Sequence, residues 1–207
     1  MINDLIKLYD DQNIRVKFYV AARFRLLKLE YYLQFIPHGG LIVDAGCGYG
    51  VLANYLSLNL PGNRITGIDM NSKRIAAAMQ TIGKRGNIEF LARDAIKWDW
   101  PTCSGIIMTD FLHHVSPSNQ KIVLDRAAQS LGKGGILVIS EVDPAAKPFY
   151  RYWASYLSDR ILYPFSKSYF RTSKYWYGIL NNLNFEVKTV RPRDTAFAGI
   201  IYVCSKV

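Results

Sequence analysis

The feature that most constrains the fold is the stretch LIVDAGCGYG at residues 41–50, where a short apolar run ends at Asp44 and three glycines follow at alternate positions. Because glycine has no Cβ atom, a chain with this spacing can turn sharply and bring its backbone close to a ligand. A second apolar run, RITGID, ends at Asp69, 19 residues beyond Gly50. A carboxylate at that strand end can accept hydrogen bonds from both hydroxyls of a ribose. The pattern therefore predicts a strand–turn–helix motif that binds an adenosine ligand.

Apolar runs with the length of strands recur along the chain at residues 41–45, 64–68, 88–91, 105–108 and 136–140. Helical or turn-rich segments separate them, an alternation typical of a parallel sheet built from βαβ units. Two further runs, at 185–190 and 199–204, are joined by a loop too short for a crossover helix, so we expect them to pair antiparallel. The predicted fold class is α/β: a seven-stranded, mostly parallel sheet with an antiparallel last strand and helices on both faces.

One domain is expected, because 207 residues of 50% hydrophobic composition can bury one core and no repeat or long linker divides the chain. Within it we distinguish an N-terminal lid helix region (1–40), a cofactor-binding core (41–142), an acceptor-side insert (143–184) and a C-terminal strand pair (185–207).

The lid region has apolar residues three or four apart, which predicts a helix with a buried face. The members of that face are Ile14, Phe18, Ala22, Leu26, Leu29, Leu33 and Ile36. Val20 and Arg23 are expected on other sides of the helix.

The glycine spacing departs from the GxGxxG motif of dinucleotide-binding proteins, because Val51 stands where the third glycine is needed. Asp44 beside the turn would also repel a pyrophosphate, but it would attract a ligand with sulfonium and ammonium groups. An acid followed by GxGxG resembles the first motif of the class I S-adenosylmethionine-dependent methyltransferases. That resemblance implies a Rossmann-like fold, S-adenosyl-L-methionine as cofactor and methyl transfer as the reaction.

The resemblance continues over residues 41–141 and implies roles for individual residues. Asp69 is similar to the family's ribose-binding acid, with Met70 near the adenine, and Asp94-Ala95 are similar to its adenine-edge motif. Cys47 lies inside the glycine turn, where we expect a small packing residue and not a nucleophile. The implied cofactor-binding set is Asp44, Gly46, Cys47, Gly48, Gly50, Asp69, Met70, Asp94, Ala95 and Thr109.

The segment Asp110-Phe111-Leu112-His113-His114 resembles the family motif that borders the methyl group. Aligning an acceptor with an already activated methyl group can contribute on the order of 7–11 kcal/mol, so few catalytic residues are needed. For a hydroxyl or acidic carbon acceptor, a general base would add typically about 10² to 10⁴ in rate. Asp110, His113 and His114 are the candidates, although the histidines could instead cap the strand or pack under the next helix. No cysteine spacing indicates a metal site.

The insert suggests what the acceptor is. Residues 149–177 contain twelve aromatic residues, Phe165 among them, and five basic residues, but Asp159 is their only acid. Some of these aromatics must be core, and the excess predicts an apolar pocket with a basic rim for a hydrophobic small molecule or a lipid-like or polyketide-like acceptor. Residues 143–207 carry +6 of the net charge of +10, which favours peripheral contact with an anionic membrane or an acidic carrier protein.

Two alternatives stay open. Interleaved aromatic and basic residues can also bind RNA or DNA, although Thr109-Asp110-Phe111-Leu112 lacks the (Asn/Asp)-Pro-Pro-aromatic motif of many base-amine methyltransferases. Because a fold does not establish catalysis, a non-catalytic S-adenosylmethionine-binding subunit is the other alternative.

Three separated cysteines, an acidic opening segment and the lack of a long apolar run favour a cytoplasmic protein, with peripheral membrane contact as an option.

Overall fold

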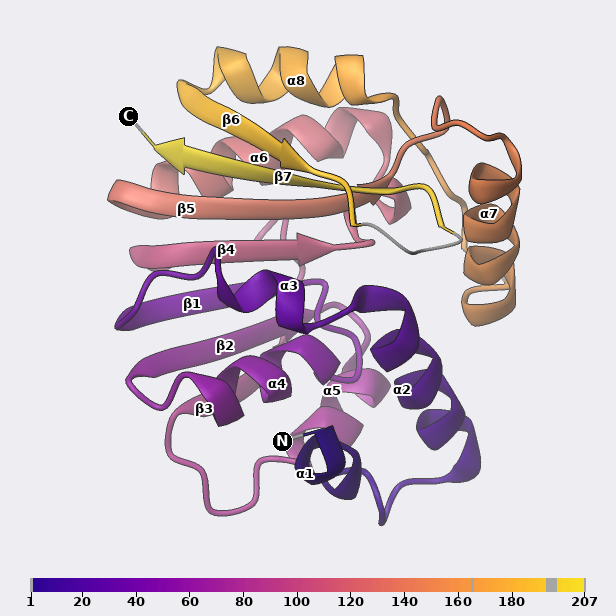
Figure 1. Ribbon diagram of the computed structural model, residues 1–207. Helices are drawn as coiled ribbons and strands as arrows, with labels where there is room; N and C mark the ends of the chain where they lie inside the picture. The colour runs from indigo at the N-terminus through magenta and orange to yellow at the C-terminus, as the bar shows by residue number, and fades with distance from the viewer. Residues whose placement is uncertain (1, 165, 193–196, 207) are drawn as a thin grey trace.

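The computed structural model describes residues 2–164, 166–192 and 197–206, so Phe165 of the insert lies outside the described residues. Seven strands form one sheet in the order β3-β2-β1-β4-β5-β7-β6 (Figure 1). Their bounds are β1 Gly40–Ala45, β2 Asn63–Asp69, β3 Ile88–Ala92, β4 Cys103–Thr109, β5 Leu131–Val142, β6 Phe185–Val190 and β7 Gly199–Lys206. Strands β1 to β5 pair in parallel, whereas β7 runs antiparallel to both β5 and β6. The predicted fold class is confirmed.

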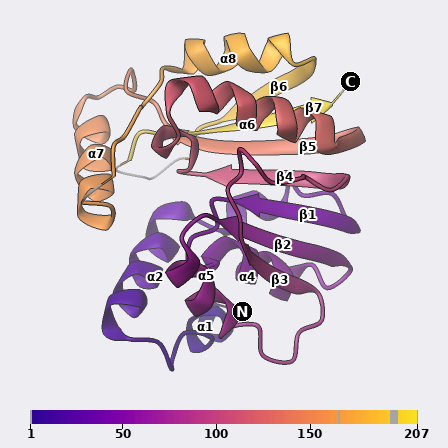
Figure 2. The same cartoon turned by 180° about the vertical axis from the view of Figure 1, so that it is seen from behind.

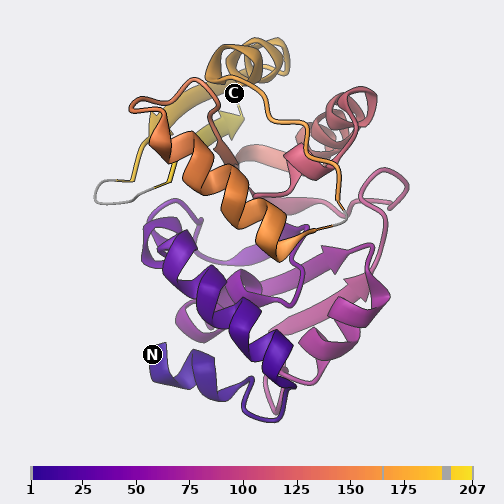
Figure 3. The same cartoon turned by 90° about the vertical axis from the view of Figure 1, so that its right-hand side faces the viewer.

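Helices cover both faces of the sheet. In Figure 1, α4 lies in front of the half formed by β1 to β3, and Figure 2 shows α6 covering β5 from behind. The helices are α1 Ile2–Lys7, α2 Ile14–Leu27, α3 Glu30–Leu33, α4 Val51–Asn59, α5 Ser72–Met79, α6 Pro117–Ser130, α7 Tyr150–Leu162 and α8 Ser173–Asn182, with a 3-10 turn at Leu112–His114. Figure 3 shows α2 and α7 side by side, at the end of the sheet where the parallel strands finish.

The central strands are buried on both faces, because successive side chains of a strand point to opposite sides. In β4, Ile107 packs into the core on one side and Ile106 into the core on the other, and both are fully buried. Burial on both faces is why such strands are apolar at consecutive positions and do not alternate. Trp176 and Leu180 of α8 complete the second core.

The predicted buried face of the lid helix is wrong for α2. Ile14 and Phe18 are 78% and 64% exposed, whereas Val20 and Arg23 are buried. The helix is turned so that Tyr19 and Val20 pack into the core beside α4. Both sides of this segment carry apolar residues at helical spacing, so periodicity alone did not distinguish them.

The predicted helix is also broken. Lys28 adopts a left-handed conformation with φ 44°, and the short α3 follows. Beyond the break, Leu29 and Ile36 are buried as predicted. The Leu26 side chain lies outside the described part of the structure.

The orientation of α2 can be tested by a pair of substitutions. Val20→Ala is expected to lower the free energy of unfolding by about 2 kcal/mol, because two buried methyl groups are lost and a cavity remains. Phe18→Ala on the exposed side should change it by less than about 0.5 kcal/mol. Urea unfolding followed by circular dichroism measures both, and the reverse order of effects would contradict this orientation.

Candidate cofactor and acceptor site

The glycine turn after β1 is tied to the end of β2. The backbone amides of Gly46 and Cys47 both donate to the Ile68 carbonyl, at 2.8 and 3.0 Å. Gly46 has φ 78°, and a Cβ atom there would collide with the Phe111 ring. Only glycine tolerates both this positive φ and this close approach of the Phe111 ring. The turn therefore packs closely against the end of β2 and leaves open space beside it.

Hydrogen bonds fix Asp69 at the edge of this open space. Its carboxylate accepts hydrogen bonds from the backbone amides of Gly48 at 3.0 Å and Asn71 at 2.8 Å. Asp94 is held in the same way by the amide of Ile96, at 2.9 Å. The two acids are therefore fixed by backbone donors at the ends of neighbouring strands.

A pocket of about 640 Å³, part of it open to solvent, lies between these acids. We call it the cofactor pocket. Five residues of the predicted cofactor set line it, together with His114 from the catalytic candidates: Gly46, Asp69, Met70, Asp94 and Ala95.

Asp44 is the least satisfied group near the turn. It is 1% exposed, and neither of its carboxylate oxygens has a hydrogen-bond partner among the described residues. Burial raises the pKa of Asp44 to about 7. A buried carboxylate without a partner is costly, and a cationic ligand group would remove that cost. Asp44 thus fits a ligand that carries an ammonium or sulfonium.

The other members of the predicted set do not line the cofactor pocket. Gly48 and Gly50 shape the turn, and burial raises the pKa of the Cys47 thiol well above its ordinary value, as expected for a packing residue. Thr109 is buried at the end of β4, where its carbonyl accepts from Arg23 at 3.5 Å.

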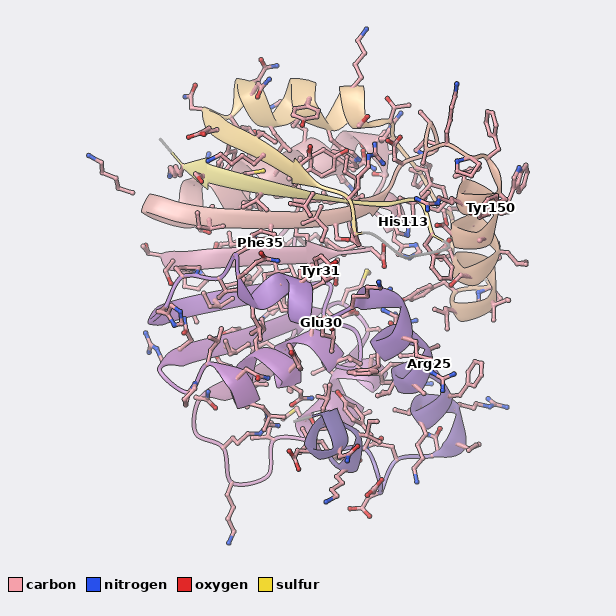
Figure 4. All side chains as sticks on the ribbon, viewed as in Figure 1. Arg25, Glu30, Tyr31, Phe35, His113 and Tyr150 are labelled. Atoms are coloured by element: carbon pink, nitrogen blue, oxygen red, sulfur yellow. The ribbon has the colours of Figure 1, made fainter. Side chains whose placement is uncertain are left out.

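A second pocket of about 730 Å³, again partly open, lies on the other side of the histidine pair. We call it the acceptor pocket. It lies among α2, β5 and α7, and its polar lining includes Arg23, Asp110, His113 and Asp159. Figure 4 shows His113 between the sheet and α7. His113 lines the acceptor pocket and His114 the cofactor pocket, and their ring centroids are 4.2 Å apart.

His113 is held as a cation. Its Nδ1 lies 2.6 Å from Glu141 Oε2, and its Nε2 lies 3.4 Å from Asp159 Oδ1. Burial by itself would lower its pKa, but the charge of Glu141 and the hydrogen bonds of Asp159 and Glu141 outweigh burial and raise the pKa of His113 to about 10. Glu141 also accepts from the Leu112 amide at 2.7 Å, so the same carboxylate positions the 3-10 turn.

His114 has the opposite charge state. Burial, and then the adjacent charge of His113, lower the pKa of His114 to about 4. Its Nδ1 lies 3.0 Å from the Ser166 hydroxyl. His113, His114 and Asp159 each offer an atom within 4.8 Å of the others, a spacing that a metal could use. A metal-binding histidine must be deprotonated, however, and two carboxylates keep His113 protonated. We therefore interpret this group as an ion-pair network.

Asp110 is engaged by Arg23, whose Nη1 donates to Asp110 Oδ2 at 2.6 Å. Asp110 has φ 47°, and its amide donates to the Ser140 carbonyl at 2.8 Å. The prediction that Arg23 lies away from the buried side of the lid helix is wrong, because the pairing with Asp110 gives its charge a buried partner. A signal was present: Arg23 follows Val16 and Val20 at helical spacing, a basic residue on an apolar stripe.

Comparison with known proteins identifies the fold and its ligand. Residues 42–135 match the family model described as a methyltransferase domain. This segment, just under half of the chain, is similar to the S-adenosylmethionine-dependent methyltransferases. The cofactor of this family is S-adenosyl-L-methionine, and the unpartnered Asp44 and the fixed acids Asp69 and Asp94 suit its cationic and ribose groups.

Two curated relatives are similar to part of this chain. A carboxy-S-adenosyl-L-methionine synthase of Chromohalobacter salexigens is 28% identical over 117 residues, which are 54% of this chain and 42% of that protein. A ribosomal RNA small subunit methyltransferase C of Pseudomonas aeruginosa is 31% identical over 109 residues, 51% of this chain and 32% of that protein. The matched segments span less than half of either relative.

Among solved structures, the magnesium protoporphyrin IX methyltransferase of Synechocystis PCC 6803 with bound S-adenosylhomocysteine has a TM-score of 0.69. It is 16% identical, and the alignment covers 100% of this chain and 94% of that one. This likeness shows a shared fold.

Asp44 generates a prediction about both stability and binding. Its pKa is about 7 in the folded protein and roughly 3.9 in an unfolded chain, so between these values the folded state binds more protons. The free energy of unfolding of the cofactor-free protein should therefore fall as pH rises from about 4 to about 7. Asp44→Asn should flatten this dependence and raise the Tm at pH 8.

The same Asp44→Asn variant should bind S-adenosylhomocysteine roughly 10- to 100-fold more weakly, because a charge-assisted contact to the ligand's ammonium is lost. Thermal unfolding across pH and titration calorimetry measure the two effects. Parallel pH curves for variant and wild type, or an unchanged affinity, would contradict the role given to Asp44.

Proposed function

We propose that this protein transfers the methyl group of S-adenosylmethionine to a hydrophobic acceptor, a small molecule of lipid-like or polyketide-like character. The observation that carries the proposal is the pair of adjacent pockets with His113 and His114 between them. One pocket has the acids suited to an adenosyl ligand. The other has the size and lining for a separate organic molecule.

The chain's own residues have two tasks in this scheme. Asp44, Asp69 and Asp94 hold and orient the cofactor, which supplies when bound a methyl group already activated on a sulfonium. Tyr19 of α2 lies over the glycine turn, and its hydroxyl is hydrogen-bonded to that of Tyr163 after α7. This contact joins the two helices above the turn and restricts the access of water to the site.

The residues that line the acceptor pocket suit an apolar acceptor that carries one acidic hydroxyl group. Val142 and Phe197 contribute apolar surface, whereas Arg23 and His113 bring positive charge. Arg23 and His113 favour the anion of a phenol or enol bound beside them, whose proton is released to water, whereas Asp110 and Asp159 in the same lining oppose it. His113 then contributes positive charge beside the acceptor and does not act as a base, because its two ring nitrogens already face Glu141 and Asp159. Asp110 orients Arg23.

The state of His113 predicts the pH dependence of the rate. His113→Gln should lower kcat by roughly tenfold, equivalent to about 1.4 kcal/mol of transition-state stabilisation, because the positive charge beside the acceptor oxygen is lost. In the wild type the rate should persist to about pH 10 and fall above it as His113 loses its proton. Transfer of a tritium-labelled methyl group to a panel of phenols and quinols measures both.

The matched control is His38→Gln, because His38 is exposed in the loop before β1. It should leave the rate unchanged. A rate that rises as pH passes through 10, or an effect of His113→Gln below twofold, would exclude a role for the positive charge of His113.

The cofactor assignment has its own test in Asp69. Asp69→Ala should weaken S-adenosylhomocysteine binding by roughly 100-fold, because contacts to two ribose hydroxyls are lost. Asp99→Ala removes an exposed acid near the neighbouring strand and should bind normally. Titration calorimetry on folded samples of both variants measures their affinity for S-adenosylhomocysteine. An undiminished affinity in Asp69→Ala would contradict the proposed contact with the ribose.

A ribosomal RNA acceptor is the second candidate, favoured by the relative from Pseudomonas aeruginosa. Basic residues of α7 and the segment after it could contact phosphates, and weak binding that is lost at moderate salt would be ordinary counterion release. Methyl incorporation into bulk RNA at physiological salt, with none into phenols or quinols, would favour this candidate over the hydrophobic acceptor.

A further inference from the structure

An apolar surface lies uncovered on α2 and α7, at the end of the molecule where the acceptor pocket opens. Its large members are 59–78% exposed: Ile14 and Phe18 on α2, and Tyr150, Trp153, Leu157 and Ile161 on α7. We call these six residues the α2/α7 face. Figure 3 shows the two helices side by side on the outside of the molecule. Burying such side chains is favourable by about 25 cal/mol per Å² of apolar area, so an exposed cluster of them indicates a binding surface.

The α2/α7 face contains a groove of about 800 Å³, partly open to solvent, between the two helices. Phe18 and Ala22 line one side, and Leu157 and Ile161 line the other. Its floor continues toward the acceptor pocket, because Ser158 and Phe197 line both. A hydrophobic molecule could therefore pass from this surface to the acceptor pocket along apolar side chains.

The charges around the face are all of one sign within the two helices. α2 has no acid, and Arg15, Lys17 and Arg25 are exposed on it. α7 has Arg151 and Arg160, and its only acid, Asp159, is buried against His113. Figure 4 shows Arg25 on α2 and Tyr150 at the start of α7, both on the outer side.

This charge pattern distinguishes the possible occupants. A second copy packed by two-fold symmetry would bring these positive charges together, which is unfavourable. An anionic bilayer would instead pair with them, at about 1 kcal/mol per basic residue near the surface. Trp153 and Tyr150 suit the interfacial region, where aromatic rings with a polar atom are favoured.

The lengths of α2 and α7 are compatible with helices that lie along a membrane surface. None of the described helices is long and apolar enough to span a bilayer. α2 and α7 have 14 and 13 residues, so each could lie along the interface for roughly 20 Å with its apolar side inward.

We propose that the α2/α7 face docks on an anionic lipid bilayer, and that the acceptor passes from the lipid through the groove into the acceptor pocket. The docking stands on the surface alone, whereas the passage of the acceptor rests on the proposed function. Both basic and apolar residues contribute, so binding should depend on anionic lipid and on insertion of the face.

The test is co-sedimentation of the full chain with vesicles of phosphatidylcholine and phosphatidylglycerol, at low and physiological salt, compared with phosphatidylcholine alone. We expect binding to the anionic vesicles at least tenfold stronger. Trp153 fluorescence should shift to shorter wavelength on binding, and the Trp153→Phe variant should lack that shift while it still binds.

Pairs of double variants distinguish vesicle binding through the α2/α7 face from non-specific attraction between a basic protein and an anionic membrane. Phe18→Ser combined with Leu157→Ser should weaken vesicle binding by at least tenfold, whereas Met79→Ser with Ile122→Ser, exposed on α5 and α6, should not. Arg15→Gln with Lys17→Gln should weaken it by roughly fivefold per charge, whereas Lys73→Gln with Lys84→Gln should have little effect.

Three results would overturn the docking proposal. The first is no binding to anionic vesicles at low salt. The second is equal binding by the Phe18/Leu157 variant and its Met79/Ile122 control. The third is a dimer in solution that the Phe18/Leu157 variant abolishes, which would assign the face to a second copy. Asp69→Ala should keep vesicle binding while it loses S-adenosylhomocysteine, so failure of docking and failure of the methyl-transfer proposal are distinguishable.

Discussion

The central position of β1 is the constraint on which the rest of the structure depends. With β2 on one side of β1 and β4 on the other, the connections that leave the carboxyl ends of these strands diverge and open a crevice. The glycine turn occupies that crevice, and the carbonyl of Ile68 holds it there through two backbone amides. Asp69 is the last residue of β2, and Asp94 lies two residues beyond the end of β3. Because β2 and β3 pair in parallel, both acids lie at the same end of the sheet. The position of the cofactor pocket therefore depends on the strand order and on the glycine turn.

The two histidines between the pockets, His113 and His114, show how the surroundings determine the charge of chemically identical side chains. His113 and His114 are consecutive, and their ring planes are tilted by 52°. Glu141 and Asp159 make His113 a cation, whereas burial and then the charge of His113 disfavour a proton on His114. Glu141 comes from β5 and Asp159 from α7. The docking of α7 on the sheet therefore determines the protonation of a residue in the 3-10 turn after β4. This arrangement places a buried cation, flanked by two carboxylates, in the wall of the acceptor pocket.

Much of this architecture could be predicted from local patterns. The strand runs, the glycine spacing and the acids at strand ends are short-range features, and each has one structural solution that satisfies its backbone. Asp44 was assigned to a cationic ligand from its position alone, and its lack of a protein partner is consistent with that. In α8, Trp176 and Leu180 are four residues apart in the sequence, and both are buried on the side of the helix that faces the core.

What the sequence by itself determined was the order of strands and helices, the cofactor turn and the acids beside it, because those depend on neighbouring residues and on the geometry of parallel strands. Only the tertiary structure decided which side of the lid helix is buried. Two apolar stripes compete there, and the choice between them came from distant contacts: Tyr19 with Tyr163, and Arg23 with Asp110. The same choice turned Ile14 and Phe18 outward beside the exposed stripe of α7. The charge of His113 was likewise set by Glu141 and Asp159, 28 and 46 residues away along the chain, which no local pattern encodes.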